Sequence, residues 1–134
     1  MNSYYVAIAC MLAALFLPYV AIIIAKAGPG FDNRYPRDWL ARMEGYRKRA
    51  HAAHLNAFET TPPFYAAVIL NIALGSAAVQ LNQLALLFVA MRVLHLVFYV
   101  GDKPTLRSVV FTVAMGCVVV LFWNALSIAL LNVK

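Results

Sequence analysis

The stretch TTPPFYAAVILNIALGSAAVQLNQLALLFVAM, residues 60–91, carries no formal charge. A membrane-spanning helix needs about 20 apolar residues, so this stretch is too long for one straight span. Its middle contains small and amide residues typical of a turn, namely Gly75, Ser76, Gln80, Asn82 and Gln83. The sequence therefore predicts two antiparallel spans joined by this turn. The first must begin before Thr60, which places Glu59 in or near the hydrocarbon.

Two further apolar segments flank this pair. Residues 4–25 carry no charge and are long enough to span a bilayer. We do not expect a cleaved signal peptide, because no Lys or Arg precedes this segment and it exceeds the roughly 7 to 15 residues of a signal core. The last segment covers about residues 106–132, with Thr105 as its expected N-cap. With a third span at about 84–100, the sequence predicts an all-α integral membrane four-helix bundle forming one domain over residues 1–134.

The charges fit this topology. The chain has 134 residues, of which 64% are hydrophobic and 12% charged, and its net charge is +6. Seven of the eleven Lys and Arg residues fall within residues 26–49, between two spans, while Lys103 and Arg107 lie in the loop before the last span. A basic loop beside a membrane explains this cluster better than a nucleic-acid patch. The positive-inside rule then places both basic loops in the cytoplasm and both termini on the opposite side.

Polar stripes mark two of the predicted helices. Arg49, Asn56 and Glu59 fall within an arc of about 80° on one helix, and Arg92, His95 and Tyr99 within about 60° on the next. Charged groups at membrane depth are costly unless paired or hydrated, so we expect these side chains to turn into the bundle and meet there. A structural alternative pairs Glu59 with Arg92 and bonds Asn56 to a neighbouring helix. Six polar residues exceed what one such pair requires, which favours a functional pocket.

Arg107 and Ser108 lie in the first turn of the last predicted helix. Unpaired backbone N–H groups there favour an anion, to which arginine adds a positive charge and serine a hydroxyl donor. Such an environment stabilises a thiolate, the nucleophilic form of a thiol. The alternative for Arg107 is an interfacial arginine that reaches lipid phosphates.

Other chemistries find little support in the sequence. His51, His54 and His95 lack an HExxH motif and a nearby cysteine, so we predict no metal site. Cys10 and Cys117 lie in apolar segments and are expected to be small buried hydrophobic residues. Gly-rich phosphate loops and serine nucleophile elbows are absent from the sequence, which gives no support to a kinase or a hydrolase.

Three segments resemble the MAPEG family, the membrane-associated proteins of eicosanoid and glutathione metabolism, in its short bacterial form. They are RAHAAHLNAFETTPPF (49–64), RVLHLVFYV (92–100) and TLRSVVFT (105–112), the last two being closest to the branch that contains microsomal prostaglandin E synthase. The chain as a whole resembles microsomal glutathione transferase and prostaglandin E synthase. The resemblance implies a homotrimer in a bacterial inner membrane, with glutathione bound between subunits. It assigns glutathione contacts to Arg49, Asn56, Glu59, Arg92, His95 and Tyr99. Arg107 and Ser108 would face the thiol as catalytic residues, and a hydrophobic electrophile would arrive from the lipid.

The sequence departs from the family pattern beside Asn56. Ala52 stands where family members often have an arginine, and Leu55 replaces the basic residue of the prostaglandin synthase branch. The leading hypothesis is a glutathione-dependent transferase, with peroxidase activity left open. A non-catalytic protein that binds lipids or lipid mediators is the second hypothesis. A small transporter with Glu59 and His95 as a proton relay is a third, which the lack of inverted repeats disfavours.

Overall fold

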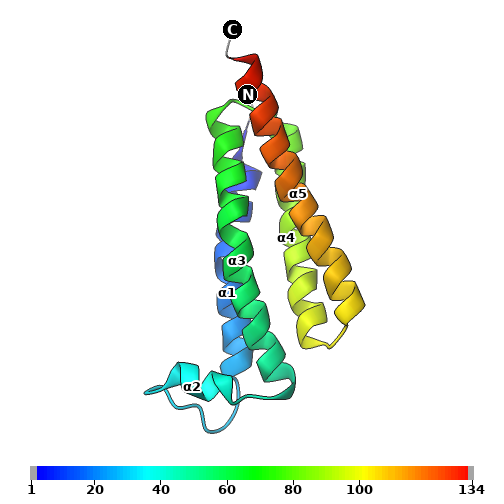
Figure 1. Cartoon of the computed structure of the whole chain (residues 1–134). Helices are drawn as coiled ribbons and strands as arrows, with labels where there is room; N and C mark the ends of the chain where they lie inside the picture. Colours follow the sequence, from blue (N-terminus) through cyan, green and yellow to red (C-terminus); the bar gives the residue numbers. More distant parts are fainter. Residues whose placement is uncertain (1–2, 133–134) are drawn as a thin grey trace.

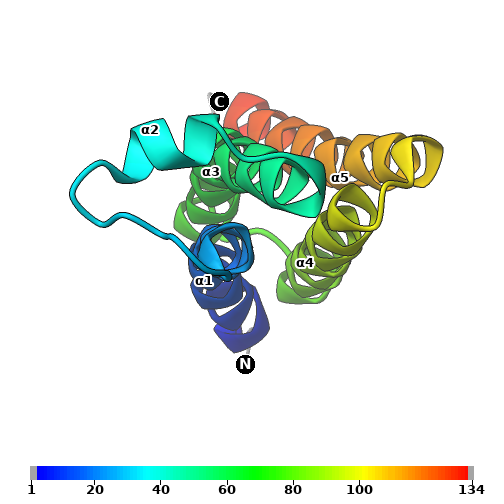
Figure 2. The same ribbon diagram turned by 90° about the horizontal axis from the view of Figure 1, so that it is seen from below.

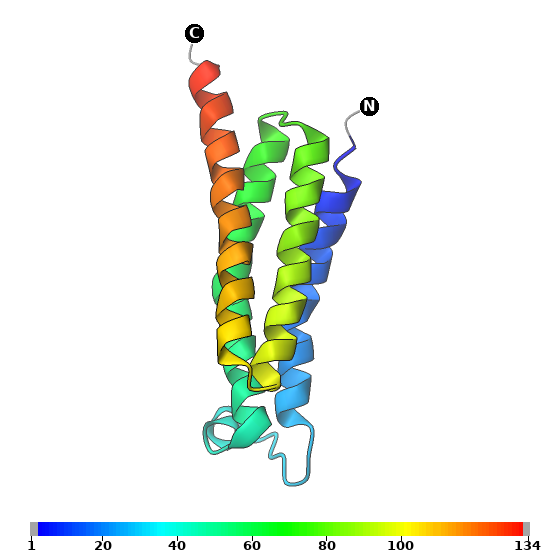
Figure 3. The same ribbon diagram turned by 90° about the vertical axis from the view of Figure 1, so that its right-hand side faces the viewer.

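The structure, a computed structural model, describes residues 3–132. Four long helices lie side by side and alternate in direction, and one short helix lies across an end of the bundle (Figure 1, Figure 3). The elements are α1 (Tyr5–Lys26), α2 (Pro36–Ala41), α3 (Gly45–Ala73), α4 (Ala78–Val100) and α5 (Pro104–Leu131). The predicted all-α bundle is confirmed, while the short helix α2 was not predicted.

Three helices, α1, α4 and α5, are each long and apolar enough to cross a membrane. Helix α3 is the longest, with 29 residues, but its polar residues keep it out of that group. Because α1 and α4 run in the same direction, α3 must carry the chain back across the membrane between them (Figure 1). The chain is therefore an all-helical, multi-pass membrane protein.

A single hydrophobic cluster joins the four long helices. It is built largely of small side chains, such as Ala7, Ala14, Ala85 and Ala114, which let helix backbones approach closely. At its centre the rings of Phe64 and Phe88 stack with their centroids 3.9 Å apart. Outside this cluster many large apolar side chains are exposed, as expected of surfaces that face lipid.

The turn between α3 and α4 is shorter than the sequence predicted. Helix α4 begins at Ala78, so Gln80, Asn82 and Gln83 are helical and their assignment to the turn was wrong. Tertiary contacts explain the Asn82 side chain, which accepts a hydrogen bond from the Ala7 amide at 3.0 Å and donates one to the Ser3 carbonyl at 2.9 Å. An amide that resembled a turn signal instead satisfies a backbone donor in the first turn of α1.

The start of α5 also differs from the prediction. The helix begins at Pro104 with Lys103 at the N-cap position, and no side chain caps it. Thr105 therefore lies within the first turn and is not the cap. Proline suits the first helical position because its fixed φ matches the helix and its missing N–H is not needed there.

The two basic loops lie at the same end of the bundle, as the charge pattern predicted. Figures 1 and 3 show the α1–α3 connection and the α4–α5 loop together, opposite the α3–α4 turn and both ends of the described chain. Seen from this end, α2 extends sideways from the bundle (Figure 2). Leu40 anchors α2, packing with Ala25 of α1 and Ala50 of α3 in a second buried cluster.

Candidate functional site

A cavity of about 270 Å³ lies between α3, α4 and α5 near the basic end of the bundle. It is lined by Asn56 from α3, His95 and Tyr99 from α4, and Arg107, Ser108, Phe111 and Thr112 from α5. Five of the eight residues singled out in the sequence therefore share one cavity, which we call the α3–α4–α5 cavity.

Arg92 is bonded to a lining residue of this cavity but does not line it. Its side chain is only 4% exposed, and Nη2 donates a hydrogen bond to Asn56 Oδ1 at 2.9 Å. The other terminal nitrogen, Nη1, is buried and has no partner among residues 3–132. Of the structural alternative, the bond from Asn56 to a neighbouring helix is thus formed, whereas Glu59 and Arg92 form no ion pair among residues 3–132. A buried donor without an acceptor is costly, so this guanidinium keeps hydrogen-bonding capacity for a further acceptor.

The part of the lining that α5 contributes includes Arg107 and Ser108, which lie on the first two turns of that helix. The guanidinium of Arg107 lies over the Tyr99 ring, 4.4 Å from its centroid, so the cation is held by an aromatic face and not by a carboxylate. The Ser108 hydroxyl donates to the Pro104 carbonyl oxygen at 3.0 Å. Its lone pairs remain available, and the hydroxyl must rotate away from Pro104 before it can donate to a ligand.

His95 of α4 also lines the cavity. It is 3% exposed and makes an edge contact with Tyr99, their ring centroids being 5.4 Å apart. Phe111 packs against its other side at 5.8 Å. The sequence reasoning missed Phe111 and Thr112, although each follows Arg107 or Ser108 by four residues, the spacing that places side chains on one helix face.

Two predicted residues lie away from the cavity. Arg49 is half-buried and reaches across to the end of α4, where its Nε donates to the carbonyl oxygen of Val100, the last residue of that helix, at 3.1 Å. Its Nη1 lies 3.7 Å from the carboxylate of Asp102. Glu59 is exposed on the surface of α3, about 21 Å along the helix from its start at Gly45.

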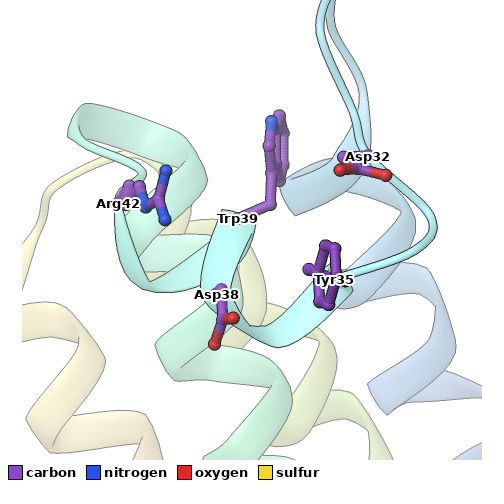
Figure 4. Close-up of a pocket in the computed structure, with 5 residues that line it drawn as sticks. All are labelled: Asp32, Tyr35, Asp38, Trp39 and Arg42. Atoms are coloured by element: carbon purple, nitrogen blue, oxygen red, sulfur yellow. The ribbon is translucent and has the colours of Figure 1, made fainter.

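A separate hollow of about 290 Å³ lies in the segment that contains α2 (Figure 4). It is lined by Asp32, Tyr35, Asp38, Trp39 and Arg42, none of which was predicted to belong to a site. Both carboxylates and Arg42 are exposed to solvent. This hollow is therefore a feature of the connecting segment and is independent of the α3–α4–α5 cavity.

Comparison with known proteins agrees with the architecture. A profile of the MAPEG family matches residues 6–127, a range that includes all four long helices except for a few terminal residues and every residue lining the α3–α4–α5 cavity. Searches of curated proteins and of solved structures gave no match. Since the profile covers nearly the whole chain, the protein belongs to the MAPEG family.

Proposed function

We propose that the protein is a glutathione-dependent transferase that joins the thiol of glutathione to hydrophobic electrophiles at the membrane. The observation that supports this most strongly is the unpaired Nη1 of Arg92, whose Nη2 is bonded to Asn56 in the lining of a cavity that also holds Arg107. Leaving a buried donor unsatisfied costs about 1 to 3 kcal/mol. A ligand carboxylate at this position would remove that cost.

The polar groups of the cavity suit glutathione, a tripeptide with two carboxylates. Arg92 would bind a carboxylate, with Asn56 holding the guanidinium in place through the bond at 2.9 Å. His95 and Tyr99 offer a ring nitrogen and a hydroxyl to the peptide groups. These residues fit the ligand in charge and in hydrogen-bonding capacity.

Arg107 and Ser108 would act on the sulfur. When bound, glutathione supplies a thiol whose ionised form attacks an electrophilic carbon. Arg107 adds a positive charge at the N-terminus of α5, where backbone N–H groups already favour an anion, and both effects favour loss of the thiol proton to solvent. Ser108 would rotate from the Pro104 carbonyl and donate its hydrogen to the thiolate.

We also propose that the site is completed in a homotrimer. Ser108 and Thr112 are exposed in the single chain, so the α3–α4–α5 cavity is open on its α5 side. The exposed carboxylate of Glu59 at membrane depth would cost several kcal/mol against lipid. Neighbouring subunits would cover Glu59 with polar groups and close the open side of the cavity, while Arg49 would keep its contacts with Val100 and Asp102.

The basic loops give a proposed orientation. By the positive-inside rule the end that holds the α3–α4–α5 cavity faces the cytoplasm, where glutathione is present, and the termini face the periplasm of a bacterial inner membrane. Apolar electrophiles could reach the cavity along Phe111 from the hydrocarbon.

The direct test is conjugation of glutathione to chlorodinitrobenzene by the purified protein. The reaction forms a carbon–sulfur bond and releases chloride and a proton, so product absorbance reports the rate. Arg107→Ala should slow it at least tenfold, whereas Arg34→Ala, which removes an exposed cation outside the cavity, should not. Absence of conjugation, or equal conjugation rates in Arg107→Ala and Arg34→Ala, would contradict the proposal.

A second candidate, a non-catalytic lipid-binding protein, is favoured by one observation. Ala52 and Leu55 leave the Asn56 turn of α3 without the basic residues of the family pattern, and Leu55 is 50% exposed. This candidate predicts lipid binding without thiolate formation. Ultraviolet difference absorbance on adding glutathione separates the two, because thiolate absorbs where thiol does not.

A further inference from the structure

A larger cavity, of about 510 Å³, lies on the other side of α3, between α1, α2 and α3. Its lining combines apolar and basic side chains: Ile22, Lys26, Pro36, Arg37, Leu40, His51, His54 and Leu55. None of these residues lines the α3–α4–α5 cavity, and none takes part in the proposed conjugation. We call it the α1–α2–α3 cavity.

The charges of this cavity have one sign. Lys26 and Arg37 contribute positive groups, and His51 and His54 add two imidazoles, whereas no carboxylate is among its lining residues. The ammonium of Lys26 lies over the Phe31 ring, 4.9 Å from its centroid, and neither cation forms an ion pair within residues 3–132. His54 Nδ1 donates to the Pro18 carbonyl at 2.8 Å, which leaves Nε2 as the free ring nitrogen.

The position of the cavity in the membrane defines its occupant. Lys26 is the last residue of α1, so its ammonium lies where a membrane span leaves the hydrocarbon, whereas His54, bonded to Pro18 two turns earlier on α1, lies deeper. Ile22 lies one turn deeper on α1, and Leu55 lies one turn beyond His51 on α3, so the apolar part of the lining continues toward the acyl chains. Basic pockets between membrane helices on the positively charged side bind anionic lipid headgroups.

We propose that the α1–α2–α3 cavity binds an anionic phospholipid, with its phosphate at Lys26 and Arg37 and an acyl chain along Ile22 and Leu55. The assignment accounts for both the apolar and the basic part of the lining. A soluble anion would leave the apolar wall unused, and a zwitterionic lipid would bring a cation of its own beside Lys26 and Arg37. The site would hold one lipid at the junction of α1 and α2, and it does not depend on the proposed transferase activity.

Native mass spectrometry of the full chain in a non-ionic detergent tests this directly, with phosphatidylglycerol and phosphatidylcholine as the probes. We expect phosphatidylglycerol to bind more tightly. Because each basic residue near a membrane surface contributes about 1 kcal/mol to anionic lipid binding, Lys26→Gln/Arg37→Gln should weaken it about thirtyfold. The matched control, Arg34→Gln/Arg42→Gln, removes the same charge from exposed residues of the same segment and should bind as the parent does.

Three outcomes would overturn the assignment. The first is equal loss in the test and control pairs, which would mean that only net charge matters. The second is displacement of the lipid by inorganic phosphate at similar concentration, which would show that the apolar wall contributes nothing. The third is displacement by glutathione, which would assign the cavity to a soluble peptide. Arg37→Glu, at an exposed position of α2 where folding should be unaffected, must also abolish the preference for phosphatidylglycerol.

Discussion

Arg49 and Asp102 join α3 to the loop that leads into α5. The Nη1 atom of Arg49 lies 3.7 Å from the Asp102 carboxylate, while its Nε donates to the Val100 carbonyl oxygen at 3.1 Å. Asp102 has a positive φ of 57°, a backbone conformation that non-glycine residues rarely adopt. Arg107 follows five residues after Asp102. The contacts of Arg49 therefore fix the position of the chain just before α5, the helix that carries Arg107.

The two contacts of Arg49 should contribute unequally to the free energy of unfolding. The Asp102 side chain is 70% exposed, so Asp102→Ala should change the free energy of unfolding by less than about 1 kcal/mol. Arg49→Ala also removes the hydrogen bond to a backbone carbonyl and should cost about 1 to 3 kcal/mol. Thermal unfolding in detergent measures both, and a larger loss in Asp102→Ala than in Arg49→Ala would refute this ranking.

Arg49 should also influence catalysis without touching the ligand. If it positions the start of α5, Arg49→Lys should lower kcat for conjugation with little change in the KM for glutathione. A direct contact with glutathione, as family resemblance implies, would instead raise KM. The two parameters, measured with chlorodinitrobenzene, therefore distinguish a positioning role from a binding role.

Arg92 should stabilise the complex with glutathione but should not stabilise the protein without ligand. Replacing it with methionine removes the unpartnered Nη1 and also the bond to Asn56, whose oxygen lines the cavity and can accept from water instead, so the midpoint of thermal unfolding without ligand should stay the same or rise. Glutathione affinity should fall about ten- to a hundredfold, the effect of losing one charge-assisted hydrogen bond. Calorimetric titration measures the affinity.

Asn56→Ala is the informative companion to that change. It leaves the whole guanidinium of Arg92 without its 2.9 Å partner, so it should destabilise the free protein by about 1 to 3 kcal/mol. The double variant Asn56→Ala/Arg92→Met should recover most of this loss. Additive losses in the double variant would show that the two side chains are not coupled.

Asn82 should stabilise the first turn of α1 and slow hydrogen exchange there. Asn82→Ala removes the acceptor of the Ala7 amide, and loss of a comparable helix-capping contact costs about 0.5 to 2 kcal/mol. Hydrogen exchange at the Ala7 amide should accelerate in this variant. Gln83→Ala, at an exposed neighbouring position on α4, is the control and should leave that exchange rate unchanged.

Much of the helical plan could be predicted because hydropathy and charge are local signals. Residues 4–25 were assigned to a span, and α1 covers Tyr5–Lys26. The basic loops were assigned to one side and lie at one end. The amides at Gln80 and Asn82 misled the prediction of the turn because an amide in a turn and an amide bonded to another helix look alike in sequence. Only tertiary contacts distinguish the two.

The candidate site was predictable in part for the same reason. Helical periodicity places residues on a face, so Asn56, His95 and Tyr99 could be expected to converge. Periodicity does not reveal what lies opposite that face. Arg49 occupies the predicted stripe, yet its partner is a loop whose course depends on the packing of α4 against α5. Glu59 is on the predicted helix, yet it is exposed on the surface of the single chain.

The contact between Arg107 and Tyr99 provides the sharpest test of how the site stabilises a thiolate. The guanidinium lies 4.4 Å from the ring centroid, so the ring face, and not the hydroxyl, orients the cation. Tyr99→Phe should keep this contact and therefore keep most of the thiolate absorbance on adding glutathione. Tyr99→Leu removes the aromatic face, a loss of about 0.5 to 2 kcal/mol, and should reduce the thiolate fraction by about two- to thirtyfold. If Phe and Leu reduced the signal equally, the hydroxyl would be the important group, and Tyr99 would act as a hydrogen-bonding residue instead of as a support for Arg107.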